Sequence, residues 1–213
     1  MTFVKNDIIH NELYFVIFII ILILIAILKS KYGELSKQLI FSIFDKKSSD
    51  KFLKRDNVFS ERINYIFNII LVNNFSLVLL VFTKDLSYTN YFKILTLVLI
   101  FFSSKYLLIG FLCEVFNITE LKRFSLFHTF LYEKIYSLVV TPILIMYFFS
   151  SISYNYYLIN FFMILLILTI LFKLKNVFNL LMNTVGIKTF HIILYLCIAE
   201  IIPISLIAKG IFY

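Results

Sequence analysis

Six long apolar runs constrain this chain more than any other feature. Their lengths lie near the range of about 17–25 residues that a helix needs to cross a bilayer. A soluble domain has only about 45–50% hydrophobic residues, whereas this chain has 62%. The sequence therefore predicts an all-α, polytopic membrane protein that forms one integral membrane domain over residues 1–213. The predicted spans are 13–28, 63–82, 92–112, 134–150, 156–173 and 190–208.

The distribution of basic residues predicts how the chain is oriented. Cytoplasmic loops of membrane proteins carry an excess of lysine and arginine. Of the 20 basic residues, fifteen fall in the loops after the first, third and fifth spans, four fall on the opposite side, and Lys105 falls inside the third span. This bias predicts three cytoplasmic loops and both termini on the periplasmic side of a bacterial inner membrane. Because the charge flanks apolar runs, the net charge of +8 does not indicate a nucleic-acid partner.

The cytoplasmic segment 29–62 is predicted to be amphipathic rather than a plain linker. Leu35, Leu39 and Ile40 recur at helical spacing, with charged residues on the other face. Such a helix lies at the membrane interface, where its basic side contacts anionic lipid headgroups. A helix that docks onto a membrane or envelope protein fits the same pattern. Shorter segments at 119–134 and 174–186 have a similar alternation and are also predicted to be interfacial helices.

Two charged residues lie where lipid makes charge costly, Lys105 in the third span and Glu200 in the sixth. A central acid costs about 2.5–3.5 kcal/mol on the insertion scale. The eleven Ile, Leu and Phe residues of 190–208 contribute about −3 to −7 kcal/mol on that scale, so insertion remains favourable over most of the range. The two helices run in opposite directions with both residues near mid-depth, which predicts a buried Lys105–Glu200 pair. The pair either fixes helix register or forms a proton- or ion-coupled site.

A second pair of polar candidates, Glu114 and His191, lies nine residues closer to the cytoplasm than the first pair. Nine residues turn a helix by about 180° net, so Glu114 and Lys105 face opposite sides of a straight helix. One helix–helix contact therefore cannot hold both pairs. Glu114 and His191 are predicted to reach water separately near the cytoplasmic interface.

Four other residues inside the runs have predicted structural roles. Asn73 and Asn74 are expected to hydrogen-bond across helices, as polar side chains do between membrane helices. Pro142 and Pro203 are expected to kink their helices, because proline lacks a backbone donor.

The sequence contains no catalytic motif, no Cys/His spacing of a metal site and no phosphate-binding glycine loop. It therefore predicts no catalytic residue, no metal and no cofactor. The first functional hypothesis is a structural or accessory subunit of an envelope complex, with lipid and membrane or envelope proteins as partners. The first alternative is a small proton- or ion-coupled transporter module that uses Lys105, Glu200 and His191. The second is an intramembrane lipid-modifying enzyme with Glu114, His128 and His191 near the inner face.

Two stretches resemble a known family. They are FLKRDNVFSERINYIFNIILVNNFSLVLLVF at 52–82 and FHIILYLCIAEIIPISLIAK at 190–209, with EKIYSLVVTPIL at 133–144 as a third, weaker match. The family is a polytopic inner-membrane family of Bacteroidota-type bacteria whose function is unknown. The resemblance implies a cytoplasmic-membrane protein of a Gram-negative bacterium and implies no activity. The most specific residues are Tyr195, Leu196, Cys197, Glu200, Ile201 and Pro203.

Overall fold

A computed structural model describes residues 4–42, 58–83, 86–115, 122–149 and 155–185. Within these ranges the regular structure is entirely helical, without a strand, which confirms the all-α prediction. The helices are α1 (Val4–Phe41), α3 (Val58–Thr83), α4 (Tyr88–Val115), α5 (Lys122–Phe149) and α6 (Asn155–Val185).

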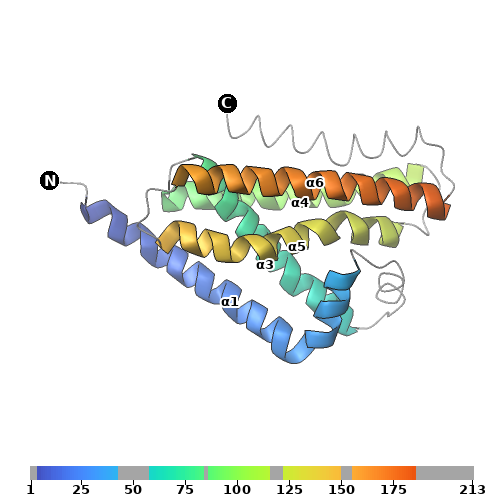
Figure 1. Cartoon of the computed structure of the whole chain (residues 1–213), viewed down its shortest axis with the longest axis horizontal. Coiled ribbons are helices and arrows are strands. Elements are labelled where there is room, and N and C mark those ends of the chain that lie inside the picture. Colours follow the sequence, from blue (N-terminus) through green and yellow to red (C-terminus); the bar gives the residue numbers. More distant parts are fainter. Residues whose placement is uncertain (1–3, 43–57, 84–85, 116–121, 150–154, 186–213) are drawn as a thin grey trace.

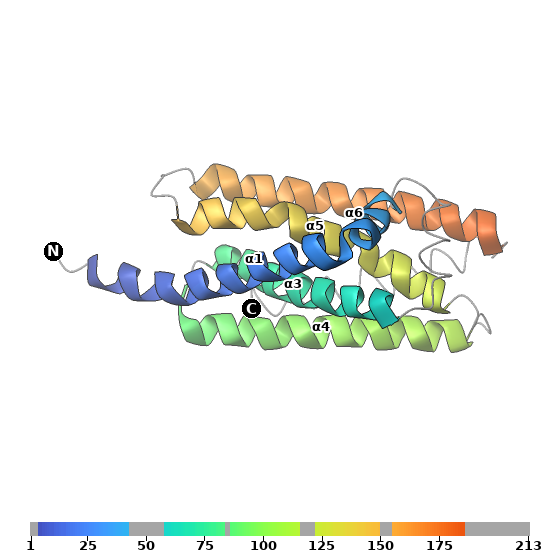
Figure 2. The ribbon, with the colours of Figure 1, turned by 90° about the horizontal axis from the view of Figure 1, so that it is seen from below.

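The helices form a bundle in which α3 is central. α3 contacts α1, α4, α5 and α6, while α5 also contacts α1, α4 and α6. α4, α5 and α6 run along the long axis of the molecule, and α3 crosses them obliquely (Figure 1). The view from below places α6 and α4 at opposite edges with α5 and α3 between them (Figure 2). Side chains of α5 can therefore contact both outer helices.

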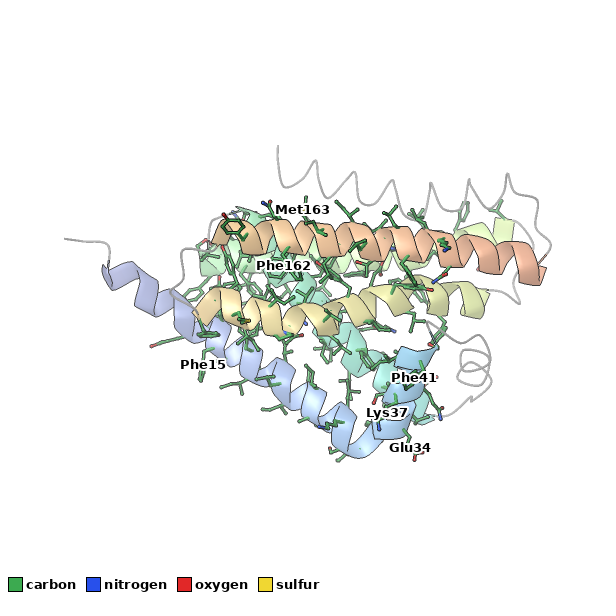
Figure 3. The ribbon with its side chains drawn as sticks, in the orientation of Figure 1. Phe15, Glu34, Lys37, Phe41, Phe162 and Met163 are labelled. Carbon is green, nitrogen blue, oxygen red and sulfur yellow. The ribbon has the colours of Figure 1, made fainter. Side chains whose placement is uncertain are left out.

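Apolar side chains of the bundle point outward as well as inward. Phe162 is fully buried, whereas its neighbour Met163 on α6 is 46% exposed and Phe15 on α1 is 56% exposed (Figure 3). Water solvates such a surface poorly, because exposing apolar area to it is unfavourable. Lipid solvates it without this penalty. The exposed apolar faces therefore fit a protein whose outer surface contacts a bilayer.

Four described helical segments are long and apolar enough to cross a membrane. They correspond to the first four predicted spans, so the prediction of a membrane protein with transmembrane helices is supported. Of the other two predicted spans, 156–173 lies within α6, which is not among the four, and 190–208 lies outside the described residues. Among the described residues, the structure thus supports four of the six predicted spans. The four segments are Glu12–Phe41, Glu61–Thr83, Tyr88–Val115 and Phe130–Phe149.

The first helix differs most from its predicted boundaries. The predicted span ended at residue 28, but α1 continues to Phe41 through a kink at Tyr32, where φ is −129° and ψ is 26°. Beyond the kink, Leu39 is buried, whereas Glu34 and Lys37 are exposed (Figure 3). This short arm is therefore amphipathic and packs its apolar side on the bundle. Of the predicted segment 29–62, residues 43–57 lie outside the described part of the chain, and residues 58–62 belong to α3.

Candidate functional site

Three charged side chains from three helices meet inside the bundle. Lys105 Nζ of α4 lies 2.6 Å from Glu133 Oε1 of α5, and Lys173 Nζ of α6 lies 2.7 Å from the same oxygen. The side chains of Lys105 and Lys173 are almost fully buried, and that of Glu133 is 18% exposed. We call Lys105, Glu133 and Lys173 the charged cluster. Its single carboxylate oxygen links α4, α5 and α6.

The second carboxylate oxygen of Glu133 has a different environment. Glu133 Oε2 is buried and has no hydrogen-bond partner among the described residues. Both ammonium groups therefore approach the carboxylate from one side. An ionised carboxylate can accept about four hydrogen bonds, so Oε2 keeps its accepting capacity.

Aromatic rings complete the surroundings of the buried lysine. Lys105 Nζ lies 5.8 Å from the ring centre of Phe101 and 5.9 Å from that of Phe130. Phe101 precedes Lys105 by one helical turn on α4, and Phe130 precedes Glu133 by nearly one turn on α5. A cation within about 6 Å of a ring face is attracted to it. The two rings therefore add cation–π attraction to the ammonium group of Lys105.

The cluster occupies one level of the bundle. Glu133 lies sixteen residues before Phe149 at the end of α5, which is about 24 Å along the axis. Lys105 lies seventeen residues after Tyr88 at the start of α4, or about 25 Å. The cluster thus lies closer to the end of the bundle where α5 begins and α4 and α6 end.

A fourth buried charge, Lys134, follows Glu133 in the chain but points elsewhere. Its Nζ donates a hydrogen bond of 3.2 Å to Asn64 Oδ1 of α3, and the residue is 7% exposed. Lys134 lines a cavity of about 620 Å³ between α3, α4 and the first half of α5. Leu99 and Tyr106 of α4 line the same cavity.

Asparagine side chains of α3 hydrogen-bond to both neighbouring helices. Asn74 Nδ2 donates to the Ser137 carbonyl at 2.9 Å and to Thr141 Oγ1 at 2.8 Å, both on α5. Asn73 Oδ1 accepts a bond of 3.0 Å from the Tyr91 hydroxyl of α4. Both asparagines thus hydrogen-bond to a neighbouring helix.

The remaining sequence-predicted site residues are distributed over the chain without forming a common site. Glu114 is exposed near the end of α4. Pro142 is exposed within α5, which continues through it as one helix. The predicted partner of Lys105, Glu200, lies outside the described residues, so the Lys105–Glu200 pair stays a prediction. The same holds for His191, Tyr195, Leu196, Cys197, Ile201 and Pro203.

Sequence reasoning missed Glu133, Lys134 and Lys173, and it assigned the two lysines to charged flanks. Lys134 and Lys173 had been counted among the cytoplasmic loop residues, but the structure places them in helices with their side chains buried. A signal was available in the sequence. Apolar residues continue on both sides of each lysine, as in LFHTFLYEKIYSLVV and TILFKLKNVFNLLM. Such continuity indicates a helix that extends beyond its charges.

A comparison with models of known protein families identifies the family of this chain. A family model described as a domain of unknown function, DUF4271, matches residues 14–211. The chain belongs to this family. Comparisons with curated proteins and with solved structures give no significant match. The matched residues of this DUF4271 protein include the charged cluster, Lys134 and the whole cavity.

The described residues of the DUF4271 protein offer few side chains that could bind a metal or react. No group of three or more His, Cys, Asp or Glu side chains there is placed to hold a metal ion. The charged cluster has one acid, and two ammonium groups contact it. Its direct effect is to hold three helices at one level, since polar groups buried in lipid seek partners on neighbouring helices.

Proposed function

We propose that this DUF4271 protein is a structural or accessory subunit of a bacterial envelope complex. The observation that carries the proposal is the shared oxygen of Glu133, which accepts from both Lys105 and Lys173 and so ties three helices together. Asn74 adds a second tie between α3 and α5. Buried polar groups that bind one another serve to fix one helix arrangement. A rigid bundle of this kind suits a scaffold for other membrane proteins.

We further propose six spans, with both termini in the periplasm of the inner membrane. α6 supports the fifth span, because it is 31 residues long and exposes Ile164, Ile167 and Leu168. Burial of Lys134 and Lys173 removes two of the fifteen basic residues assigned to the cytoplasmic side. The remaining thirteen still outnumber the four on the other side, so the positive-inside argument keeps its direction.

Site-specific photo-crosslinking in native membranes tests the subunit proposal. A photoreactive amino acid replaces Leu168, which is 60% exposed on α6, or Phe162, which is buried on the same helix. We expect Leu168 to give a discrete crosslinked protein band, and Phe162 to give only crosslinks within the chain. The proposal is wrong if Leu168 and the other exposed positions of α1, α4 and α6 all crosslink only to lipid.

The second candidate is a proton- or ion-coupled transporter module. It is favoured by one observation, the buried Oε2 of Glu133 without a described partner inside a candidate span. Ionisable groups within membrane bundles often mark ion pathways. Proton flux into vesicles that contain the full chain, in excess of empty vesicles and lost in Glu133→Gln protein that is still folded, supports the transporter. The absence of such flux in the wild-type protein excludes proton transport and leaves the scaffold proposal.

A further inference from the structure

The cavity between α3, α4 and α5 has a charged end and an apolar end. Asn64 and Lys134 lie at one end, together with Tyr106 of α4. Leu71 of α3 lies seven residues beyond Asn64, and Leu99 lies seven residues before Tyr106. Since α3 and α4 are antiparallel neighbours, both walls change from polar to apolar in the same direction. Seven helical residues correspond to about 10 Å.

Lys134 makes the charged end of this cavity cationic. The residue is 7% exposed, and its Nζ donates to a neutral amide oxygen of Asn64. No carboxylate of the described residues lies within 4.0 Å of this Nζ. A buried charge is stable only when a counter-charge or several hydrogen bonds compensate its lost hydration. The adjacent Glu133 carboxylate acts on this ammonium without contacting it, and an anion in the cavity would supply a negative charge in direct contact.

The depth of Lys134 indicates the source of that anion. Lys134 lies fifteen residues from the end of α5, or about 22 Å, within a core of about 30 Å. Side chains on a helix lean towards its N-terminus, so Lys134 leans towards the membrane boundary at which α5 begins. Long lysine side chains reach from the core towards the headgroups in this way. The charged end thus lies close to the lipid phosphates of one leaflet.

We propose that this cavity binds one anionic phospholipid, with its phosphate at Lys134, Asn64 and Asn68 and an acyl chain against Leu71, Val72 and Leu99. Asn64 and Asn68 are one turn apart on α3, so their amides lie on the same face. A phosphate has several oxygens that accept hydrogen bonds, which matches one ammonium and two amide groups. The volume of about 620 Å³ is within the usual range of ligand pockets. The cavity contains none of the three cluster residues, although Phe130 lies against both the cavity and Lys105, and the lipid proposal does not depend on the scaffold proposal.

Native mass spectrometry of the full chain in detergent tests the proposal. The probes are phosphatidylglycerol, phosphatidylcholine and inorganic phosphate. We expect one phosphatidylglycerol per chain, bound at least about tenfold more tightly than phosphatidylcholine, which is the size of one charge-assisted contact. Lys134→Met should abolish this preference. Lys175→Met is the matched control, because Lys175 is an exposed lysine on α6 outside the cavity, and it should leave the preference unchanged.

A second variant distinguishes a lipid from a free phosphate. Leu99 is 47% exposed, so Leu99→Trp fills the apolar end with little cost to folding. It should weaken phosphatidylglycerol binding while Lys134 remains in place. Excess inorganic phosphate should fail to displace the lipid from the wild-type chain.

Three results would each overturn the proposal. The first is equal binding of phosphatidylglycerol and phosphatidylcholine by the wild-type chain. The second is displacement of the lipid by inorganic phosphate, which would identify a free anion as the ligand. The third is unchanged lipid binding in both Lys134→Met and Leu99→Trp. If Lys134→Met does not fold, Asn68→Leu replaces it, because Asn68 is an exposed donor of the same end.

Discussion

At the scale of single residues, the bundle depends most on one carboxylate. Glu133 stands between two buried ammonium groups, each within 2.7 Å of its Oε1. Loss of the negative charge removes the carboxylate that both Lys105 Nζ and Lys173 Nζ contact. Like charges in a poorly hydrated site repel strongly. Glu133 therefore contributes more to the stability of the folded bundle than Lys105 or Lys173 alone.

We expect Glu133→Gln to destabilise the bundle by about 3–5 kcal/mol, the usual cost of breaking a buried ion pair by removing one partner. Thermal unfolding of the purified protein in detergent measures the loss. Glu34→Gln is the control, since Glu34 is exposed on the arm of α1, and it should change stability little. Equal melting temperatures for Glu133→Gln and the wild type would contradict this role of the cluster.

Substitution of two buried tyrosines by phenylalanine should change the stability of the protein in opposite directions. The Tyr136 hydroxyl is buried without a hydrogen-bond partner among the described residues, whereas the Tyr14 hydroxyl donates to the Leu86 carbonyl at 3.1 Å. Tyr136→Phe removes an unsatisfied group and should stabilise the protein by about 1 kcal/mol or more. Tyr14→Phe should destabilise it by about 1 kcal/mol. The same unfolding assay compares them, and changes of equal sign would contradict the two assigned environments.

At the scale of the helices, α1 is divided by its kink at Tyr32. Gly33 follows directly, and glycine weakens a helix because it loses more backbone entropy on folding than other residues. The kink lets the short arm place Leu39 in the core while Lys37 stays outside.

Gly33→Ala should stabilise the protein by about 0.5–1 kcal/mol through helix propensity. A Cβ added at this position meets no atom within 4 Å, so no packing penalty opposes the gain. Thermal unfolding measures it. A fall in stability would mean that the arm requires the conformational freedom of glycine at this position.

Sequence reasoning found the four supported helices because long apolar runs leave few alternatives in lipid. It also selected Lys105, since a lysine in the middle of such a run is conspicuous. It did not find Glu133 as a partner, because matching depth along two helices does not determine which faces meet. Sequence reasoning did not identify Lys173 as a buried residue for another reason. A charge near the end of an apolar run is typical of both a loop and a helix that continues, and only packing distinguishes them.

At the scale of the whole molecule, the proposed orientation places the residues around Lys51 in the cytoplasm and those around Lys209 in the periplasm. Reporter fusions in a bacterial host test this. A fluorescent protein that folds only in the cytoplasm should be bright when fused after residue 51, and a phosphatase that requires the periplasm should be active after residue 209. The reverse pattern would overturn both the orientation and the lysine bias on which it is based.

The order of the three cluster residues in the sequence sets the order in which their contacts can form during synthesis. Lys105 precedes Glu133 by 28 residues, and Lys173 follows it by 40. During synthesis α4 reaches the membrane before α5, so Lys105 is already present when Glu133 enters. Lys173 enters the membrane only with α6, so its contact with Glu133 forms last. A nascent chain halted before α6 would already contain the Lys105–Glu133 ion pair. Completion of synthesis would then add the contact between Lys173 of α6 and this pair.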